Sequence, residues 1–478
     1  MNSIYFCSKL CNTIKLLPLV TTKCATTNFM EHIVIIGNGI SGVSAARHIR
    51  KLSDKRITLV SAESDHFFSR TALMYVYMGH MKFEHTKPYE DWFWKKNRIE
   101  LKNGFVVDIA TATSMLHFAD GETMRYDKLI IATGSKPNKF GWPGQNLNGV
   151  QGLYTKQDLE NLETYAPNNK VCKHAVIVGG GLIGVELAEM LHSRHIPVTF
   201  LVRESSFWNG VLPTGESEMI NKEIISNGID LRLSSNLKEI VSDDHGKVKS
   251  IIIEETGEEI SCDLVGLTAG VSPNIDFLID SNIKTNRGVL VNRNLETNIP
   301  NIYAIGDCAE QSKAIGNRRP IEAVWYTGRM MGETVAQTIC DNKLEYKPGH
   351  WFNSAKFFDI EYQTYGWVFA QRGRPDYEKH FHWMHSKNKI CITIAYHKDT
   401  HLFLGINTFG IRMRHEFFDK VLTDKQPVEY VLEHLSDANF DPEFYKLYEK
   451  EIIMQFNIEN TTNIQIKKKS WKRIFQTN

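Results

Sequence analysis

The order of apolar residues predicts two strand–loop–helix units. Residues 33–36 form a continuous apolar run, as expected of a strand that is buried on both faces. A glycine-rich stretch follows, then a helix start at 43–46 and a second apolar strand at 57–60. The same order recurs further along the chain, at 175–178, 185–188 and 198–202. Two such units predict an α/β protein with parallel sheets.

The loop of the first unit has the glycine pattern G-x-G-x-x-G between a strand and a helix. Gly37 permits a tight turn, Gly39 lets a pyrophosphate approach backbone N–H groups at the helix N-terminus, and Gly42 lets helix and strand pack closely. Ile40 and Ser41 stand between Gly39 and Gly42, ahead of the predicted helix start. We therefore predict that this loop binds a dinucleotide.

The loop of the second unit repeats the pattern with Gly179, Gly181 and Gly184, and with Leu182 and Ile183 between them. A single match to this pattern is weak evidence, because a tight turn between strand and helix can need the same glycines. Two matches in the same context are much stronger. They indicate two nucleotides held by two Rossmann-like domains.

The residues after the second strand of each unit bear on the ribose. Glu63 stands 21 residues beyond Gly42, where a carboxylate would reach an adenosine ribose hydroxyl. In the second unit Arg203 follows the strand directly, and Glu204 comes next. An arginine favours the 2′-phosphate of NADPH, whereas a carboxylate favours NADH. The order of the two slightly favours NADPH, and the alternative for Arg203 is a solvated surface charge.

Composition excludes several other classes of protein. The 478 residues carry a net charge of +1, so the chain lacks the overall basic field of a nucleic-acid-binding protein. No apolar run reaches the length of about 18 residues that a membrane-spanning helix needs. The eight cysteines include no C-x-x-C pair. We therefore predict neither nucleic acid nor a metal as a partner.

The two ends of the chain differ from the rest. Residues 1–29 contain no acidic residue, and we interpret them as a leader or disordered segment. We expect a cytoplasmic protein, or a mitochondrial one if this leader is a transit segment. The tail at 464–475 interleaves five cations with Ile, Trp and Phe. Such a tail suits peripheral contact with an anionic membrane, and a flexible charged end is the alternative.

Two further motifs carry a family resemblance. Residues 126–135 resemble a strand ending in Ala-Thr-Gly, and 301–309 resemble a strand ending in Gly-Asp. With the two glycine loops, the chain resembles the pyridine nucleotide–disulfide oxidoreductase superfamily over about residues 32–340. The resemblance implies bound FAD and NAD(P)H. It implies an FAD-binding domain at 30–147 and 268–344, interrupted by an NAD(P)-binding domain at 148–267.

The resemblance also assigns roles to single residues. Thr133, Gly134, Gly306 and Asp307 would lie against the FAD, with Asp307 accepting hydrogen bonds from it. Further residues are assigned from the two units. Arg70, after a Phe-Ser pair, would contact FAD, and its alternative is a surface salt bridge. Glu186, in the first turn of the second unit's helix, would lie near the nicotinamide, and its alternative is an ordinary acidic residue.

The segment after the first unit departs from the thiol-dependent members. Residues 67–74 hold no cysteine, and none occurs between Cys24 and Cys172. The resemblance is therefore to the thiol-free branch, such as ferredoxin and rubredoxin reductases, apoptosis-inducing-factor-like proteins and the flavin part of nitrite reductases. It implies an oxidoreductase in which NAD(P)H reduces FAD and electrons pass to a small iron–sulfur carrier. The alternatives are a membrane-surface quinone reductase and a flavin-bound sensor with slow turnover.

The last third, residues 345–478, is expected to form an α+β interface domain. Alternating segments at 390–395 and 402–407, joined by a polar turn, predict a β-hairpin. In the family a domain at this place covers the flavin or mediates dimerisation, so a homodimer is a further expectation. The predicted fold class is thus α/β: two Rossmann-like domains, one inserted in the other, plus this C-terminal domain.

Overall fold

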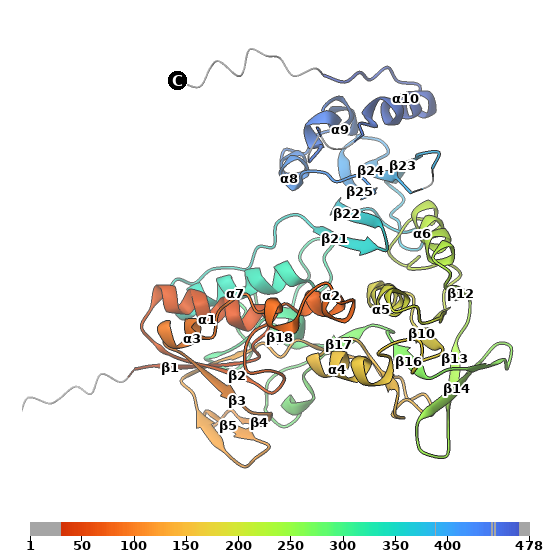
Figure 1. The fold of residues 1–478 in the computed structure, drawn as a ribbon. Helices are drawn as coiled ribbons and strands as arrows, with labels where there is room; N and C mark the ends of the chain where they lie inside the picture. Colours follow the sequence, from red (N-terminus) through yellow and green to blue (C-terminus); the bar gives the residue numbers. More distant parts are fainter. Residues whose placement is uncertain (1–29, 388, 441–442, 444–445, 468–478) are drawn as a thin grey trace, which may run out of the picture.

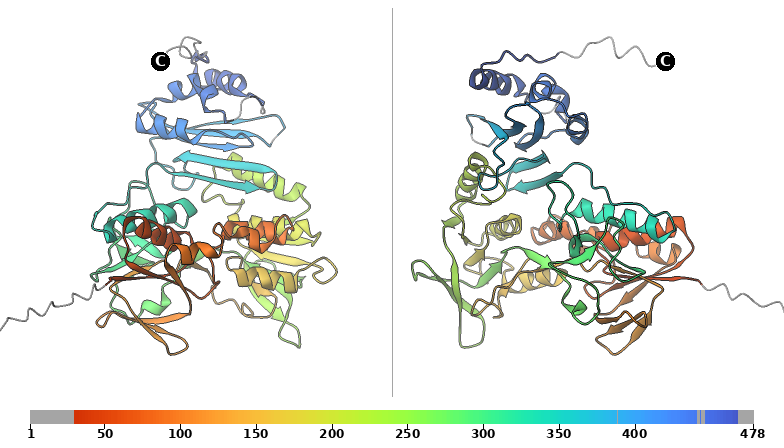
Figure 2. Two further views of the ribbon diagram at one scale, coloured as in Figure 1. Left: turned by 60° about the vertical axis from the view of Figure 1, so that its left-hand side comes forward. Right: turned by 180° about the vertical axis from the view of Figure 1, so that it is seen from behind.

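The computed structural model describes residues 30–387, 389–440, 443 and 446–467. Its ribbon is shown in Figure 1 and from two further sides in Figure 2. The leader predicted at 1–29 and residues 468–478 of the tail lie outside the described residues. Two parallel sheets form the lower half in these views, and an antiparallel sheet lies above them.

The first parallel sheet carries the first glycine loop at the end of its central strand. Its order is β19-β7-β1-β2-β3, and β1 pairs in register with both β2 and β7. Helices α1 and α7 pack against each other above it in Figure 1. The bounds are β1 (His32–Ile36), α1 (Ile40–Leu52), β2 (Arg56–Ser61), β3 (Ile99–Asn103), β7 (Lys128–Ile131), β19 (Ile302–Ala304) and α7 (Trp325–Ile339).

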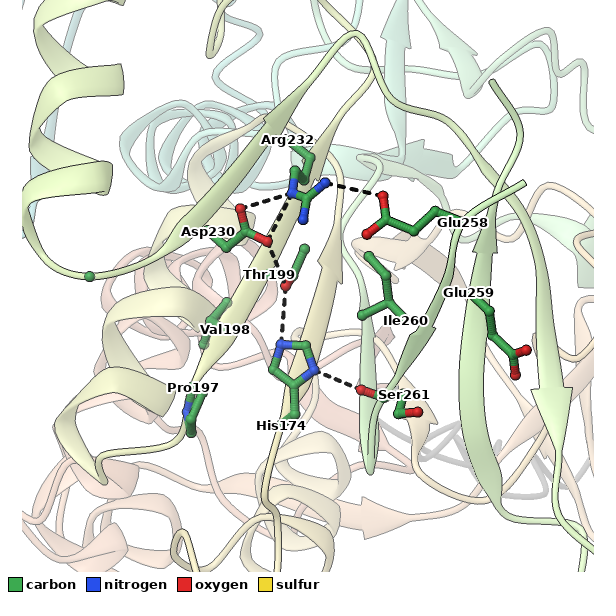
Figure 3. A pocket seen from close by; sticks show the side chains of 11 residues that line it. His174, Pro197, Val198, Thr199, Asp230, Arg232, Glu258, Glu259, Ile260 and Ser261 are labelled. Carbon is green, nitrogen blue, oxygen red and sulfur yellow. Dashed lines mark hydrogen bonds and ion pairs between the residues drawn. The ribbon is translucent and has the colours of Figure 1, made fainter. Parts of the chain in front are cut away.

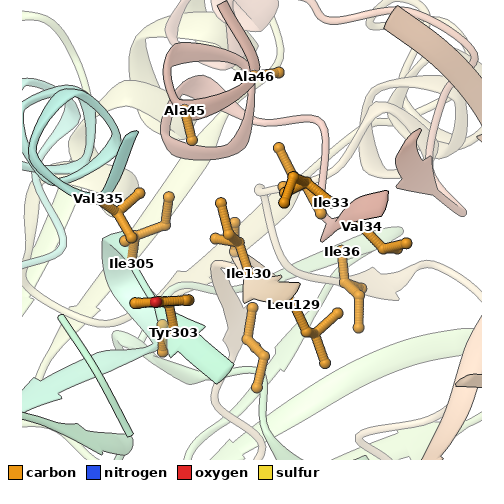
Figure 4. Packing of buried hydrophobic residues seen from close by; sticks show 14 of the residues in the cluster. Ile33, Val34, Ile36, Ala45, Ala46, Leu129, Ile130, Tyr303, Ile305 and Val335 are labelled. Atoms are coloured by element: carbon orange, nitrogen blue, oxygen red, sulfur yellow. The ribbon is translucent and has the colours of Figure 1, made fainter. Parts of the chain in front are cut away.

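The residues of this sheet form a continuous hydrophobic core. Figure 4 shows Ile33 and Ile130 on the face towards Ala45 and Val335 of the covering helices, and Val34 and Leu129 on the opposite face. The other face is covered by an antiparallel meander of β4 (Val106–Ala110), β5 (Met115–Phe118) and β6 (Thr123–Arg125). Cover on both faces explains why the strands read as unbroken apolar runs.

The second parallel sheet has the same construction and the order β12-β11-β10-β16-β9. Helices α4, α5 and α6 and a second antiparallel meander of β13, β14 and β15 accompany it. The bounds are β9 (Val150–Gln151), α4 (Lys156–Tyr165), β10 (Ala175–Val178), α5 (Leu182–Ser193), β11 (Val198–Val202), α6 (Thr214–Ser226), β12 (Asp230–Leu233), β13 (Leu237–Ser242), β14 (Val248–Ile253), β15 (Glu259–Ser261) and β16 (Leu264–Leu267).

Two short antiparallel strands, β8 (Ser135–Pro137) and β17 (Val271–Pro273), connect the two sheets. Strand β8 follows β7 of the first sheet, and β17 follows β16 of the second. The segment that leaves the first sheet is therefore paired with the segment that returns to it. Smaller elements are α2 (Leu73–Tyr77), α3 (Trp92–Lys96), β18 (Val289–Val291) and β20 (Ala309–Gln311).

The C-terminal third forms a five-stranded antiparallel sheet of order β21-β22-β25-β24-β23. One face shares a core with α5 and α6, and the other is covered by α8, α9 and α10. The bounds are β21 (Phe352–Phe357), β22 (Ile360–Gly366), β23 (Glu378–Met384), β24 (Cys391–His397), β25 (Phe403–Phe409), α8 (His415–Thr423), α9 (Val428–Glu433) and α10 (Glu449–Asn460).

The predicted fold class is confirmed, since both Rossmann-like sheets are present with their glycine loops between strand and helix. The predicted hairpin is also present, because β24 and β25 are antiparallel neighbours.

Candidate functional site

Each glycine of the first loop meets a distinct steric demand. Gly37 has φ +114°, and a Cβ there would lie 2.1 Å from the carbonyl oxygen of Ala132. A Cβ on Gly42 would lie 2.0 Å from the carbonyl oxygen of Gly37. In contrast, nothing lies within 4 Å of a Cβ built on Gly39. The loop thus combines a tight turn, a close helix contact and an open approach, as a pyrophosphate requires.

The N-terminus of α1 is prepared to bind an anion. Gly39 is its N-cap, and among the described residues no side chain caps it and no acid lies in its first turn. Ile40 and Ser41 are its first two residues. The N–H groups at a helix N-terminus have no intrahelical partner and carry partial positive charge.

The residues after β19 pack against Ser41, in the first turn of α1. Gly306 has φ +73°, and a Cβ there would lie 2.3 Å from Ser41 Oγ. A Cβ on Gly328 of α7 would lie 2.4 Å from the same atom. The structure therefore brings the late Gly306-Asp307 motif directly against the first glycine loop, although the two are far apart in sequence.

Arg70 and Glu63 are bound to each other. Arg70 Nη1 donates to Glu63 Oε1 at 2.8 Å, and Nη2 donates to Oε2 at 2.6 Å. The backbone N–H of Lys156, at the start of α4, donates to the same carboxylate at 2.9 Å. Strand β2 ends at Ser61, two residues before Glu63. The Glu63 carboxylate is thus held by an ion pair and by α4, and its contact with a ribose stays a prediction.

Tyr154 lies at the centre of this cluster, although no sequence pattern points to it. Its hydroxyl accepts a hydrogen bond from the backbone N–H of Ser135 at 3.1 Å. The same oxygen lies 3.2 Å from a Cβ built on Gly134. The guanidinium carbon of Arg70 stands 4.6 Å from the centre of the Tyr154 ring. Tyr154 therefore links the Ala-Thr-Gly segment to Arg70.

Thr133 and Gly134 are clamped by the segment that returns from the second sheet. Thr133 Oγ1 donates to the carbonyl of Asn274 at 2.7 Å, and the N–H of Asn274 donates to the carbonyl of Gly134 at 3.0 Å. Asn274 directly follows β17. Sequence reasoning missed Tyr154, Ser135 and Asn274. Only Ser135 had a signal, its position directly after the Ala-Thr-Gly motif.

Asp307 is a buried carboxyl within reach of the same groups. Ser135 Oγ donates to its Oδ2 at 3.2 Å. Burial raises the pKa of Asp307, while hydrogen bonds from Ser135 and Tyr154 and the positive charge of Arg70 act against that rise. The first loop, the Ala-Thr-Gly segment, Arg70 and Asp307 thus form one connected cluster of contacts.

The second loop repeats the geometry of the first. Gly179 has φ +123°, and a Cβ there would lie 2.6 Å from the carbonyl oxygen of Thr268. A Cβ on Gly184 would lie 2.4 Å from the carbonyl oxygen of Gly179. Nothing lies within 4 Å of a Cβ on Gly181, which is the N-cap of α5. This loop too fits a pyrophosphate.

Glu186 lies one turn further along α5 than the sequence predicts. The helix begins at Leu182, followed by Ile183, and its first turn holds no acidic residue. The prediction placed the helix start too late, so Glu186 belongs to the second turn. Burial raises the pKa of Glu186 to about 7, and the negative charge of Glu189 adds to that rise.

Arg203 stands directly after β11 and points to its sequence neighbour. Its Nη2 lies 2.7 Å from Glu204 Oε1, and its side chain is 74% exposed. The guanidinium is therefore available at the strand end, but it shares its charge with a carboxylate. A preference for NADPH stays a prediction.

A pocket at the outer edge of the second sheet is distinct from both loops. Figure 3 shows its lining, which includes His174, Thr199, Asp230 and Arg232. His174 Nε2 lies 3.0 Å from Thr199 Oγ1, and Thr199 Oγ1 donates to Asp230 Oδ2 at 3.2 Å. These polar groups bind one another, and the pocket contains no residue of either glycine loop.

Residues 31–335 match the family model of the pyridine nucleotide-disulphide oxidoreductases. The chain belongs to this family. The family uses FAD and NAD(P)H, and the two loops of this chain have the open approach and the uncapped helix N-terminus that such dinucleotides need.

Relatives in the family include two that differ in length. The chain is 31% identical to a nitrite reductase [NAD(P)H] of Bacillus subtilis over 59% of this chain and 34% of the relative. It is 30% identical to a ferredoxin–NAD(P)(+) reductase of a Sphingomonas species over 70% and 80%, respectively. The chain spans about a third to two fifths of the length of two Bacillus subtilis relatives that it matches.

The same fold occurs in a solved ferredoxin reductase from Rhodopseudomonas palustris, with a TM-score of 0.72 at 22% identity. That likeness covers 86% of this chain and 96% of the other.

The cysteine next to Asp307 is closed off from solvent. Cys308 is fully buried, and its Sγ lies 3.3 Å from the carbonyl oxygen of Ile305 and 3.5 Å from that of Ile131. Burial raises its pKa. Although the family is named for disulfide chemistry, this thiol is a packed side chain and does not supply a reactive thiolate.

Proposed function

We propose that the chain is an FAD-dependent NAD(P)H oxidoreductase that passes hydride from NAD(P)H to FAD and then electrons to a small iron–sulfur carrier. One observation carries this proposal. Two glycine loops of the same geometry, open at Gly39 and Gly181, lie on sheets joined by β8 and β17. The chain has no cysteine between Cys24 and Cys172 that could relay electrons through sulfur.

In this proposal the first loop binds FAD and the second binds NAD(P)H. Bound FAD accepts hydride and can release electrons singly. The helix N-terminus at Gly39 would hold the FAD pyrophosphate, and Asp307 would accept hydrogen bonds from FAD hydroxyls. The one at Gly181 would hold the NAD(P)H pyrophosphate, with Glu186 near the nicotinamide. The chain itself positions the two cofactors.

A row of aromatic side chains supports a protein acceptor. The ring centres of Tyr326 and Trp351 are 6.4 Å apart, those of Trp351 and Trp367 5.5 Å, and those of Trp367 and Phe369 5.8 Å. All four side chains are half-buried. Tyr326 lies in the first turn of α7, two residues before Gly328, which packs against Ser41. We call Tyr326, Trp351, Trp367 and Phe369 the aromatic row.

Three loops next to the aromatic row, at 312–320, 345–350 and 370–376, are mainly basic. Their exposed charged residues are Lys313, Arg319, Lys347 and Arg372 against Glu345 and Asp376. Half-exposed aromatic residues with a basic surround suit an acidic protein partner, since aromatic residues anchor interfaces and charge steers the encounter. We therefore propose that an acidic iron–sulfur protein docks on the aromatic row, beside the FAD loop.

The test uses the full chain purified with its flavin. We expect a yellow protein whose flavin is bleached anaerobically by NAD(P)H at about 1 s⁻¹ or faster, as in ordinary enzymes. Addition of an oxidised acidic ferredoxin should restore the yellow colour while the ferredoxin becomes reduced. A folded protein that is colourless, or one whose reduced flavin is not reoxidised by any iron–sulfur carrier, would contradict the proposal.

The other expectations rest on the sequence. Among the described residues no helix is both long and apolar enough to cross a bilayer. The start of the tail is packed on the protein, since Ile464 is buried and Lys467 pairs with Glu433 at 2.5 Å. A homodimer, a quinone acceptor and membrane contact through the tail at 464–475 stay predictions, as does the cellular location.

A further inference from the structure

The antiparallel C-terminal sheet is packed on the helices of the second parallel sheet. Phe357 and Tyr362 contact Trp208, with ring centres 6.0 and 6.2 Å apart. Two ion pairs frame this contact. Lys356 lies 3.2 Å from Glu189 of α5, and Lys389 lies 3.0 Å from Glu223 of α6. We call this contact the α6 interface.

Glu216 lies inside the α6 interface without an ionic partner among the described residues. It stands in the first turn of α6 and is fully buried. Asn407 of β25 donates from Nδ2 to Glu216 Oε2 at 2.8 Å, and Thr393 of β24 is a second hydrogen-bond partner. A buried carboxylate with neutral partners only is costly, whereas a buried carboxylic acid is not.

Two buried oxygens in this pair lack a donor in the described part of the chain. They are Glu216 Oε1 and Asn407 Oδ1, on the two side chains that already share a hydrogen bond. Both are acceptors when Glu216 is ionised, so neither can serve the other. A proton on Glu216 supplies the missing donor. Burial raises the pKa of Glu216 to about 7, in agreement with this reading.

His382 of β23 lies in the same interface and is also a titratable group without an ion-pair partner of its own among the described residues. Its Nδ1 is 2.9 Å from Thr393 Oγ1, so Thr393 stands between His382 and Glu216. A Cβ on Gly215, the neighbour of Glu216, would lie 2.8 Å from His382 Nε2. Burial lowers the pKa of His382, and the nearby His380 lowers it further.

The other titratable groups near this pair do not supply compensating charge. Tyr362 of β22 and Cys391 of β24 face Glu216, and burial raises the pKa of both, so they remain neutral. His380 is paired with Glu378 at 2.5 Å. Glu459 of α10 acts weakly on His382 and raises its pKa.

We propose that Glu216 and His382 form a proton-controlled latch between the C-terminal sheet and α6. The latch is closed when Glu216 is protonated and His382 is neutral. It opens when Glu216 ionises or His382 takes up a proton. Because Lys356 of the C-terminal sheet pairs with α5, which carries the second glycine loop, the latch sets how firmly the sheet is held against that loop's helix. It does not depend on the proposed electron transfer.

The pH dependence of closure follows from the raised pKa of Glu216 and the lowered pKa of His382. The closed form holds more protons on Glu216 than the open form between the ordinary pKa of 4.5 and about 7, so closure weakens as pH rises through that range. The closed form holds fewer protons on His382 below its ordinary pKa of 6.5, so closure also weakens as pH falls below it. The two dependences oppose each other below pH 6.5, so closure changes little at mildly acidic pH and weakens above pH 6.5. Without the opposing dependence of His382, the Glu216 dependence can reach about two orders of magnitude in the closing equilibrium.

Hydrogen exchange of the full flavin-loaded chain tests the latch without measuring turnover. Protection of residues 214–226 and 391–409 is followed from pH 5 to 8, corrected for intrinsic exchange and referred to β1. We expect protection to change little from pH 5 to 6.5 and to fall about threefold from pH 6.5 to 8. Glu216→Gln keeps an amide that can pair with Asn407 and should abolish this loss. His382→Asn removes the opposing dependence, so its protection should fall at least about tenfold from pH 5 to 8.

The matched control is Glu223→Gln, the same change on the same helix at a carboxylate that is paired with Lys389. Its protection should depend on pH as that of the wild type does. The proposal is overturned if the wild-type protection does not change with pH, or if Glu216→Gln keeps the alkaline loss. If Glu216→Gln does not fold, infrared spectra of the Glu186→Gln chain decide. A carboxylic-acid band that is present at pH 6, lost by pH 8 and shifted by Thr393→Val supports the latch, and the absence of such a band at pH 6 refutes it.

Discussion

Arg70 grips Glu63 with two parallel hydrogen bonds, of 2.8 and 2.6 Å, beside the first glycine loop. The guanidinium also lies between two rings, 5.3 Å from the centre of Phe68 and 4.6 Å from that of Tyr154. One end of the pair belongs to the first parallel sheet, and the backbone of Lys156 on the other side belongs to α4. The pair therefore fixes the two halves of the molecule where we place the FAD.

Arg70→Lys should weaken FAD binding about tenfold, because lysine keeps the charge but cannot make two parallel bonds or stack between the rings. The measurement is the FAD dissociation constant of the apoprotein by flavin fluorescence. Arg98→Lys is the control, since Arg98 pairs with Asp54 in the open, at 63% and 80% exposure. It should change nothing measurable. Equal FAD affinity in wild type and Arg70→Lys would refute the role of the fork.

Tyr154→Phe should lower the free energy of unfolding by about 1–2 kcal/mol, because it leaves the buried N–H of Ser135 without its acceptor. The ring and its contact with Arg70 remain. Thermal unfolding of the apoprotein gives the measurement. Tyr377→Phe, at a 40% exposed ring, is the control and should unfold like wild type. An unchanged midpoint in Tyr154→Phe would show that the hydroxyl stabilises nothing.

The parts of the structure that depend on neighbours in sequence could be predicted. The predicted strands 33–36 and 175–178 match β1 and β10 to within one residue, because buried parallel strands read as apolar runs that end at a glycine turn. The loops could be predicted for the same reason. Their glycines are required by contacts within one strand–loop–helix unit and with its neighbouring strand.

Contacts between distant segments left no such signal. Asn407 and Glu216 are 191 residues apart, and no spacing or periodicity connects them. Tyr154 is one aromatic residue in a connecting segment, and its importance arises only when the chain returns at Asn274 and closes the cluster. The spacing of Glu63 from the loop predicts a ribose contact, but nothing in that spacing indicates its ion pair with Arg70.

Glu186→Gln should flatten the pH profile of flavin reduction by NAD(P)H. Because burial raises the pKa of Glu186 to about 7, the side chain is neutral below that pH and negative above it. The nicotinamide becomes positive as hydride leaves, so a nearby carboxylate should speed reduction as pH rises through 7. Stopped-flow absorbance from pH 5.5 to 8.5 measures it. Glu189→Gln should only move the limb to lower pH, since Glu189 raises the pKa of Glu186. If the reduction rate of Glu186→Gln still rises through pH 7, another group causes the rise.

Arg203→Glu should raise the dissociation constant for NADPH about tenfold and leave that for NADH nearly unchanged. The guanidinium stands at the end of β11, where a 2′-phosphate would lie, and a glutamate there repels it. Equilibrium titration with each nicotinamide measures both constants. Arg232→Glu is the control, because Arg232 lies in the separate pocket with Asp230 and Glu258. Equal loss for both nicotinamides, or no loss for either, contradicts the assignment.

Trp367→Ala should lower kcat/KM for an acidic ferredoxin at least tenfold, as expected when a central aromatic anchor is removed from an interface. The indole stacks between Trp351 and Phe369, and Leu404 accepts a hydrogen bond from its backbone N–H at 2.9 Å. The substitution therefore removes surface without loosening the backbone. Steady-state assays with ferredoxin and with ferricyanide give the comparison, and only the ferredoxin rate should fall.

The control for this change is Trp92→Ala, which removes a 60% exposed indole on α3, far in sequence from the aromatic row. It should leave both acceptors unaffected. Added salt should weaken the ferredoxin reaction of the wild type, because the basic residues around the row act through long-range attraction that ions screen. A parallel loss with ferricyanide would mean that Trp367→Ala disturbs the flavin site, and the docking surface would then have to be sought elsewhere.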